Sequence, residues 1–279
     1  NIVPAAVEAE RSVVMAERRE SLGPGSRIGD ATRAFYFAGQ PLGSHSPIGT
    51  EESLKSANTE GLKAFHDRWY RPDRTVIIVS GDVDPAVMEA YVKAGFSGWK
   101  ASGPATPLPD FGRPNPALPK VKVIVEPSAP YSVSIAYLRR WSERADTIAY
   151  NQAKLTDSLA LQLINRRLEA AASAVASFLQ ASVQQDNSAR SVDATYVSIT
   201  PIGADWEKAL KDVRAIIEDA RRTPPTKADV DREFASMEAA FAQLAENAST
   251  EASASQAQDM VGAVDIRETV VSPGAALDI

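Results

Sequence analysis

The sequence predicts an α+β fold in which antiparallel sheets are covered by helices. Three observations lead to this prediction. Runs of β-branched and aromatic residues come in neighbouring pairs, which is typical of hairpins. Segments with helical periodicity follow one another in runs, whereas strands and helices alternate in a parallel sheet. A proline-rich segment separates two such groups of elements.

The first part of the chain is predicted to mix helices with one strand. A helix is expected at residues 4–20, because Gly23, Pro24 and Gly25 stop it. The remaining expected elements are a loop at 39–49, a helix from 59 to Trp69 capped by Asn58 or Thr59, a strand at 76–79 buried on both faces, and a helix at 85–93.

The proline-rich segment at residues 101–119 holds six of the 18 prolines of the chain and is therefore predicted to be a linker. We expect a domain at 1–100 before it, a second domain at 120–267 and a connector at 268–279. The second domain is predicted to begin with a hairpin of strands at 121–125 and 133–137, followed by a helix at 147–171. A second hairpin is expected, with strands at 175–184 and 191–199 around a turn at 185–189. Three helices follow: one from Trp206 to the stop at Pro224, one begun by the capping box of Thr226 and Asp229, and a weak one at 245–258.

Composition excludes several classes of protein. The 279 residues carry a net charge of −6 with scattered basic residues, which argues against nucleic acid or an anionic membrane surface as the main partner. The longest uninterrupted aliphatic run, at 76–79, is far too short to span a membrane. The absence of cysteine excludes disulfide scaffolds and thiol catalysis, but leaves periplasm and cytoplasm equally open as compartments.

The most informative segment is the first predicted helix. Glu10 and Glu17 are seven residues apart, so they share one helical face with their Cα atoms about 10 Å apart. At that separation only one of them can ligate a metal ion directly, which leaves the other to orient ligands or substrate. The alternative is a solvated helix whose acids pair with Arg11, Arg18 and Arg19.

Other candidate residues are expected to be structural. The two histidines, His45 and His66, are 21 residues apart and cannot form a helical zinc-binding pair, which needs adjacent turns. His45 is expected in a solvated loop and His66 at a helix end. Structural roles are likewise predicted for Asp82 and Asp84 in a turn, for Trp69, Tyr70 and Trp99 in packing, and for Arg166 and Arg167 in helix capping or pairing with Glu169.

Several motifs together resemble one known family. They are the glutamate motif at 10–17, Pro41-Leu42-Gly43, Pro47-Ile48-Gly49-Thr50, the stretch 62–73 with Tyr70-Arg71-Pro72, Val79-Ser80-Gly81-Asp82-Val83-Asp84, Phe96-Ser97-Gly98-Trp99 and, more loosely, 164–169 and Pro224-Pro225-Thr226. In order and spacing they resemble the pitrilysin/insulinase family of inverted-motif (HxxEH) zinc metallopeptidases, which includes processing-peptidase-like proteins.

The resemblance implies a role for each acid of the first helix. Glu17 falls at the position of the third zinc ligand, and Glu10 at that of the supporting acid. The HxxEH motif, which carries the two histidine ligands and the general base, is absent from this chain. The resemblance therefore implies a fragment of a zinc-dependent metalloendopeptidase that hydrolyses peptides or small proteins in an enclosed chamber, with no catalytic residue of its own and no zinc bound by the fragment alone.

The same resemblance gives the two predicted domains and their partners. Residues 1–100 would be the C-terminal part of a catalytic-type domain, and 120–267 a similar non-catalytic domain. Expected partners are the peptide or small-protein substrate, the remaining domains of the parent protein and, because apolar surface near the N-terminus lacks its cover, a second copy of the chain in a homo-oligomer. Two alternatives stay open: a catalytically inactive relative that serves as a zinc-free peptide-binding or assembly scaffold, and an unrelated binding module in which Glu10 and Glu17 face away from the sheet.

Overall fold

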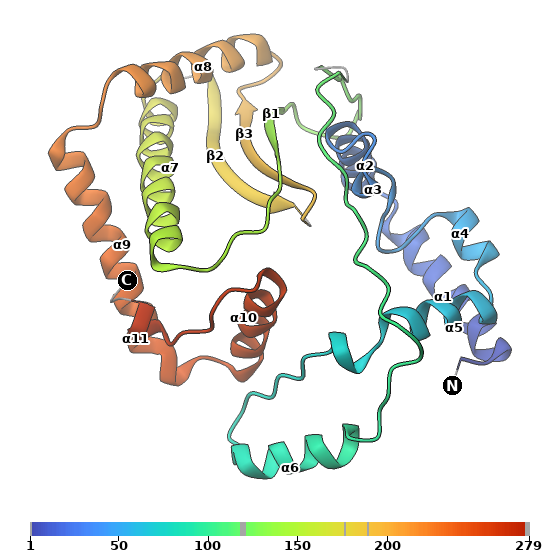
Figure 1. The fold of residues 1–279 in the computed structure, drawn as a ribbon. Helices are drawn as coiled ribbons and strands as arrows, with labels where there is room; N and C mark the ends of the chain where they lie inside the picture. Colours follow the sequence, from blue (N-terminus) through green and yellow to red (C-terminus); the bar gives the residue numbers. More distant parts are fainter. Residues whose placement is uncertain (1, 118–120, 176, 189, 277–279) are drawn as a thin grey trace. The chain divides into compact units, whose positions relative to one another are not determined.

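The computed structural model describes residues 2–117, 121–175, 177–188 and 190–276 (Figure 1). The chain divides into two compact units, Asn1–Ala129 and Pro130–Ile279, which we call unit 1 and unit 2. Within the described residues, no helix combines the length and the apolar character that a membrane span requires.

Unit 1 consists of helices joined by irregular segments, and the part of it that the structure describes contains no strand. The helices expected at 4–20, from 59 to Trp69 and at 85–93 are confirmed. The elements are α1 (Pro4–Ser21), α2 (Pro24–Tyr36), α3 (Pro41–Ser44), α4 (Glu51–Ser56), α5 (Thr59–Trp69), the short 3₁₀ helix η1 (Pro72–Arg74) and α6 (Pro85–Phe96).

Local capping explains where two of these helices begin. The side chain of Asn58 accepts a hydrogen bond from the backbone N–H of Gly61 at 2.8 Å, which caps α5. The side chain of Asp84 caps α6 by accepting from Ala86 at 2.8 Å, and Pro85 takes the first helical position, where its missing N–H costs nothing.

Two expectations for unit 1 are wrong. The segment 76–79 is not a strand, and Val76, Ile77 and Val79 are 61%, 41% and 48% exposed. A β-branched run favours extended structure, but a strand also needs a neighbour for its backbone hydrogen bonds, and unit 1 offers none in its described part. Helices α2, α3 and α4 were not expected, and α3 lies within the predicted loop at 39–49. Gly23-Pro24-Gly25 was interpreted only as a stop, whereas Pro24 also starts α2, and Pro41 likewise starts α3.

The proline-rich segment has no helix or strand in its described residues, as expected from its proline content; residues 118–120 lie outside the described part. It is nevertheless held to unit 1. The buried guanidinium of Arg71 donates to the carbonyl oxygens of Ser102 at 2.9 Å and Gly103 at 3.1 Å, and Gln40 donates to that of Phe111 at 3.2 Å. The segment therefore runs along unit 1 rather than free of it.

Unit 2 contains an antiparallel sheet covered by helices, so the predicted fold class is confirmed. The strand order is β1-β3-β2. The elements are β1 (Val133–Arg140), α7 (Ile148–Val175), β2 (Phe178–Ser188), β3 (Val192–Pro201), α8 (Trp206–Arg222), α9 (Lys227–Asn247), the 3₁₀ helix η2 (Ala248–Thr250), α10 (Ser253–Ile266) and α11 (Pro273–Ala276).

Most elements of the second domain predicted at 120–267 agree with the sequence, with three exceptions, of which the first falls in unit 1. The strand expected at 121–125 is absent, and Val121, Val123 and Val125 are 79–83% exposed. The expected hairpin of 121–125 with 133–137 therefore does not form, because β1 pairs with the distant β3 instead. The turn expected at 185–189 begins later, since β2 continues to Ser188. The weak helix expected at 245–258 is replaced by the end of α9, η2 and a separate α10.

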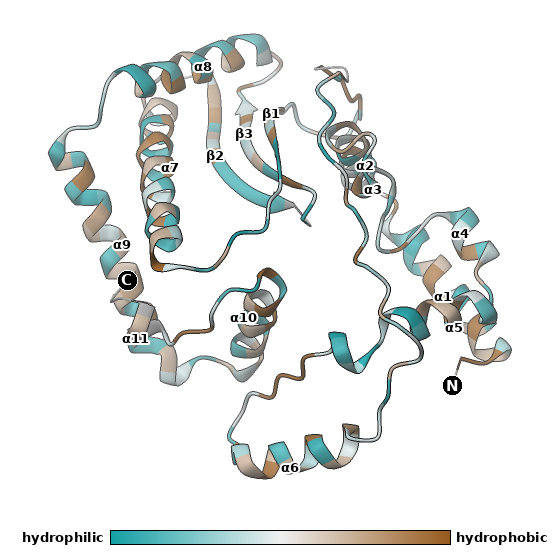
Figure 2. Ribbon diagram, in the orientation of Figure 1, coloured by the Kyte–Doolittle hydropathy of each residue, from teal (hydrophilic) through white to brown (hydrophobic). Residues whose placement is uncertain are grey.

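The core of unit 2 lies between one face of the sheet and two helices. Ile135 of β1 pairs with Val197 of β3, which pairs with Val183 of β2, so the three side chains share a face. Leu168 of α7 and Val213 of α8 are fully buried against it. Figure 1 shows α7 running alongside the strands and α8 crossing their end, and Figure 2 shows hydrophobic and hydrophilic residues alternating along both helices.

Candidate metal-ligand site on the first helix

Helix α1 carries both candidate acids. Pro4 opens it, and no glycine or proline interrupts it before its end at Ser21. Arg18 and Arg19 lie in its last turn, where positive charge stabilises the negative end of the helix dipole. The sequence therefore builds a continuous helix of five turns, and side chains seven residues apart along it share a face.

Glu10 and Glu17 are both exposed on α1. Within the part of the chain that the structure describes, neither carboxylate takes part in a hydrogen bond or an ion pair. Both carboxylates are thus accessible to an approaching metal ion, and a carboxylate oxygen is a ligand that zinc binds.

The alternative, that the acids of this helix pair with its arginines, is right for Glu8 and wrong for Glu10 and Glu17. Arg11 donates to both carboxylate oxygens of Glu8, at 2.9 and 3.2 Å. This hydrogen bonding lowers the pKa of Glu8 below its ordinary value. Arg18 contacts the carbonyl oxygen of Gly49 at 3.4 Å, and Arg19 donates to that of Met15 at 3.2 Å.

The histidines do not complete a metal site. Nδ1 of His45 lies 2.8 Å from the carbonyl oxygen of Pro41 in an exposed loop. The ring of His66 stacks on Tyr70 at 5.0 Å in the last turn of α5. Among the described residues no three His, Asp or Glu side chains gather closely enough to hold a metal ion. Within the described part of the chain, Glu10 and Glu17 therefore lie apart from any such group.

Arg166 pairs with Glu169 as predicted, whereas Asp84 and Arg167 have structural partners other than those predicted. Asp84 caps α6, and Arg166 pairs with Glu169 at 3.2 Å and also with Glu233 at 3.2 Å. Arg167 donates to the carbonyl oxygen of Thr223 at 2.8 Å, just beyond the end of α8. Both guanidinium groups therefore bind partners on α7 itself or on the neighbouring helices α8 and α9.

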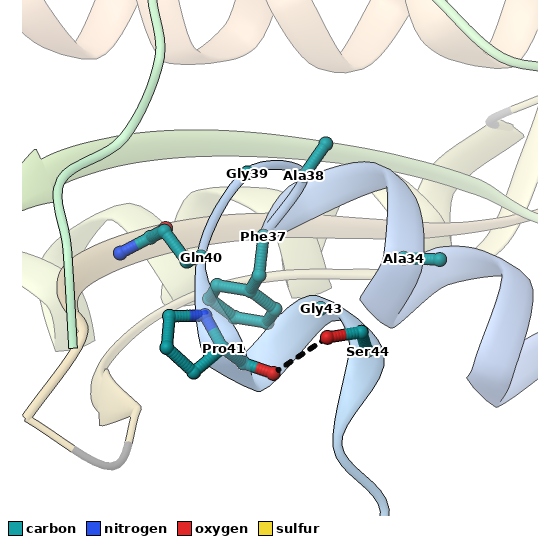
Figure 3. A pocket seen from close by; sticks show the side chains of 8 residues that line it. All are labelled: Ala34, Phe37, Ala38, Gly39, Gln40, Pro41, Gly43 and Ser44. Carbon is teal, nitrogen blue, oxygen red and sulfur yellow. Dashed lines mark hydrogen bonds between the residues drawn. The ribbon is translucent and has the colours of Figure 1, made fainter.

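A pocket lies where α2 turns into α3 (Figure 3). The ring of Phe37 and the ring of Pro41 line it, and the hydroxyl of Ser44 donates to the carbonyl oxygen of Pro41 at 3.3 Å. None of its lining residues has an acidic or basic side chain, so it cannot perform acid–base chemistry. Its lining residues are Ala34, Phe37, Ala38, Gly39, Gln40, Pro41, Gly43 and Ser44.

The sequence did not reveal what Arg11 does. Its guanidinium reaches the C-terminal end of α4, more than forty residues along the chain. The available signal was the spacing of Arg11 and Arg18, which are seven residues apart and hence share a face. No local pattern identifies carbonyl oxygens of a distant helix as their partners.

Comparison with known proteins identifies the family. A family model described as the peptidase M16 inactive domain matches residues 56–237. The chain belongs to the peptidase M16 family. The resemblance to the pitrilysin/insulinase zinc metallopeptidases is thereby confirmed, and the interpretation as an unrelated binding module is wrong.

Relatives of this M16 chain are named as zinc proteases. It is 28% identical over 172 residues to the probable zinc protease PqqL of Haemophilus influenzae, covering 60% of this chain and 18% of that protein. It is 38% identical over 117 residues to the uncharacterized zinc protease ML0855 of Mycobacterium leprae, covering 40% of this chain and 26% of that protein. These names associate zinc with the intact members of the family.

A solved structure shows the same fold. The periplasmic protease PqqL from Escherichia coli matches this M16 chain with a TM-score of 0.84 at 16% identity, over 100% of this chain and 31% of that one. The chain thus spans less than a third of the length of each of these three proteins.

Proposed function

We propose that this M16 chain is part of a longer zinc-dependent metalloendopeptidase that hydrolyses peptides or small proteins, and that Glu17 is its third zinc ligand. One observation carries the proposal. In a chain of a family of zinc proteases, Glu10 and Glu17 lie exposed on one face of α1 and make no ion pair within the described residues.

The two acids have different roles in this proposal. Zinc, when bound, supplies Lewis-acid activation of water and of the scissile carbonyl. Glu17 donates one carboxylate oxygen to it. Glu10, with its Cα about 10 Å away along the helix, orients other ligands or holds substrate. No residue of this chain serves as the general base, so the chain alone is inactive.

Unit 2 would serve as the larger part of the non-catalytic domain. The two histidines of the chain are both in unit 1, so unit 2 cannot repeat a histidine-based zinc site. We propose that residues 120–267 form this second domain, which closes the chamber around the substrate, and that 1–100, 101–119 and 268–279 are the catalytic-type part, the linker and a connector.

The decisive experiment is Glu17→Ala in the longer protein. We expect loss of most bound zinc and of peptide hydrolysis, measured by elemental analysis of the purified protein and by cleavage of a fluorogenic peptide. Glu20→Ala is the matched control, because it removes the same charge from the same helix and should leave both quantities unchanged. Zinc content that survives Glu17→Ala would refute the proposed ligand.

The isolated chain should bind zinc only weakly, because Glu17 has no companion ligands among the described residues. Isothermal titration of the 279-residue chain with zinc measures this directly. A stoichiometric complex with submicromolar affinity would contradict the proposal. The exposed apolar residues of unit 1 also lead us to propose self-association of the isolated chain, which light scattering measures.

A second candidate is a zinc-free scaffold that binds peptides or assembles with other proteins. The match to an inactive-domain model favours it for this part of the chain. The sequence of the longer protein separates the candidates: an intact HxxEH motif supports the peptidase, and substituted histidines in that motif support the scaffold.

A further inference from the structure

The guanidinium group of Arg11 makes five hydrogen bonds. It donates to the two carboxylate oxygens of Glu8 and to three backbone carbonyl oxygens, those of Leu54, Lys55 at 3.0 Å and Ala57 at 2.6 Å. An arginine side chain has five N–H groups, so the hydrogen-bonding capacity of Arg11 is fully used. Its side chain is only 16% exposed, although α1 has no fully buried residue.

The three carbonyl oxygens belong to the C-terminal end of α4. The last carbonyl groups of a helix have no N–H partner within the helix and carry its partial negative charge. A single planar guanidinium satisfies three of them here. A lysine ammonium has three N–H groups and could not serve these carbonyls and Glu8 together.

Arg18 adds a second contact, just before the N-terminal end of α4. Its Nε lies 3.4 Å from the carbonyl oxygen of Gly49. Immediately after Gly49, the hydroxyl of Thr50 accepts from the backbone N–H of Ser53 at 3.1 Å, and the hydroxyl of Ser53 accepts from that of Thr50 at 2.9 Å. Both ends of α4 are therefore tied to arginines seven residues apart on α1.

This arrangement determines how α1 is rotated about its own axis. Glu10 and Glu17 each precede one of the arginines by one residue, which places their face about 100° around the helix from the arginine face. Because α1 has no buried residue, apolar packing alone holds its rotation weakly.

We propose that Arg11, assisted by Arg18, is a positioning residue that sets the direction of the Glu10 and Glu17 carboxylates. The part of this proposal that concerns zinc rests on the proposed function; the part that concerns the rotation of α1 does not. Arg11 itself touches no metal ligand, and it acts through the orientation of the helix that carries Glu17.

The rotation can be measured directly in the 279-residue chain. It has no native cysteine, so spin labels at Glu17→Cys and Ser56→Cys report a single distance between α1 and α4 by pulsed electron paramagnetic resonance. Arg11→Ala should broaden this distance distribution about twofold, because the helix is freed to rotate. Arg19→Ala, which removes a guanidinium from the same helix without a contact to α4, should leave the distribution unchanged.

A second variant guards against simple unfolding. Arg11→Lys keeps the charge and most of the side chain, so α1 remains helical by circular dichroism, and the distribution should broaden in the same sense by a smaller amount. Distributions as narrow in both Arg11 variants as in the unchanged chain would overturn the proposal.

The link to zinc is tested in the longer protein by competition with a chromophoric chelator. Arg11→Ala should weaken zinc binding about tenfold and Arg19→Ala should not, with Glu17→Ala as the reference for loss of the ligand. If Glu17→Ala weakens binding and Arg11→Ala does not, the positioning role is wrong and the zinc ligand stands. If Glu17→Ala has no effect, the zinc ligand is wrong, and the distance measurement still decides whether Arg11 holds α1.

Discussion

Units 1 and 2 contain similar proportions of helix, yet they differ in how their side chains are buried. All residues of the hydrophobic core cluster belong to unit 2. In the described part of unit 1, only Phe37, Gln40 and Arg71 are buried, and two of these three are polar or charged. Unit 2 is held together by apolar burial, and unit 1 largely by hydrogen bonds from arginine and glutamine side chains.

The sheet accounts for this difference. In unit 2, β1, β3 and β2 present one apolar face, against which α7 and α8 bury Leu168 and Val213. Unit 1 has helices with apolar residues as well, but Phe65 of α5 is 58% exposed and Tyr91 of α6 is 67% exposed. An apolar helix stripe is buried only when a sheet or another helix packs against it; no strand lies in the described part of unit 1, and these two side chains remain exposed there.

The largest expected effect comes from the same substitution in each unit. Phe178→Ala removes a ring that is 1% exposed in unit 2 and should lower the free energy of unfolding by about 3–5 kcal/mol. Phe65→Ala removes a ring that is 58% exposed and should lower it by about 1 kcal/mol or less. Urea unfolding followed by circular dichroism measures both. Equal losses of unfolding free energy in Phe178→Ala and Phe65→Ala would show that unit 1 has a hydrophobic core of its own.

A smaller effect is expected at Arg166, which contacts one buried and one exposed acid. Glu233 of α9, with a side chain only 2% exposed, lies 3.2 Å from Nε of Arg166 on α7. Glu233→Gln should destabilise unit 2 by about 1–3 kcal/mol, because a buried acceptor loses its charge-assisted hydrogen bond. Glu169→Gln removes the other partner of Arg166, which is 68% exposed, and should cost about 0.5 kcal/mol or less. The same urea experiment checks the pair, and similar costs would contradict the role of burial.

The smallest effect is a dependence on pH that distinguishes two helix caps. Hydrogen bonds from Thr226 and Arg232 lower the pKa of Asp229, at the start of α9, from 3.8 to about 2. Because the pKa of Asp229 is lower in the folded chain than in the unfolded chain, its ionised carboxylate stabilises the fold above pH 4. This stabilisation is lost as the pH falls towards 2 and the carboxylate is protonated.

Thermal unfolding at a series of pH values measures this cap. Asp229→Asn, a neutral mimic of the protonated acid, should be less stable than the unchanged chain at pH 5 and should converge with it as the pH falls towards about 2. The cap of α5 in unit 1 is made by the amide side chain of Asn58, which does not titrate, so the effect of Asn58→Ala should not vary over this range. A constant difference for Asp229→Asn would show that the acid does not titrate with the cap.

Local signals were sufficient for most helices. The cap at Asn58, the Pro85 start after Asp84 and the capping box of Thr226 and Asp229 all act within one turn, so they can be recognised without knowledge of the fold. The pairing of Glu10 with Glu17 on one face follows from the helical repeat alone. The spacing of His45 and His66 likewise excludes a helical zinc-binding pair without knowledge of the fold.

The sequence by itself therefore determined helices α1 and α5–α9, the hairpin of β2 and β3, and the family to which the chain belongs. Only the tertiary structure decided which apolar runs become strands, since Val76 and Val121 lie in segments with strand composition that have no ladder partner, whereas β1 finds β3. It also decided that Arg11 binds the end of α4. The physical reason is common to both: a backbone group or a guanidinium is satisfied by whatever partner folding brings near it, and that partner can lie anywhere along the chain.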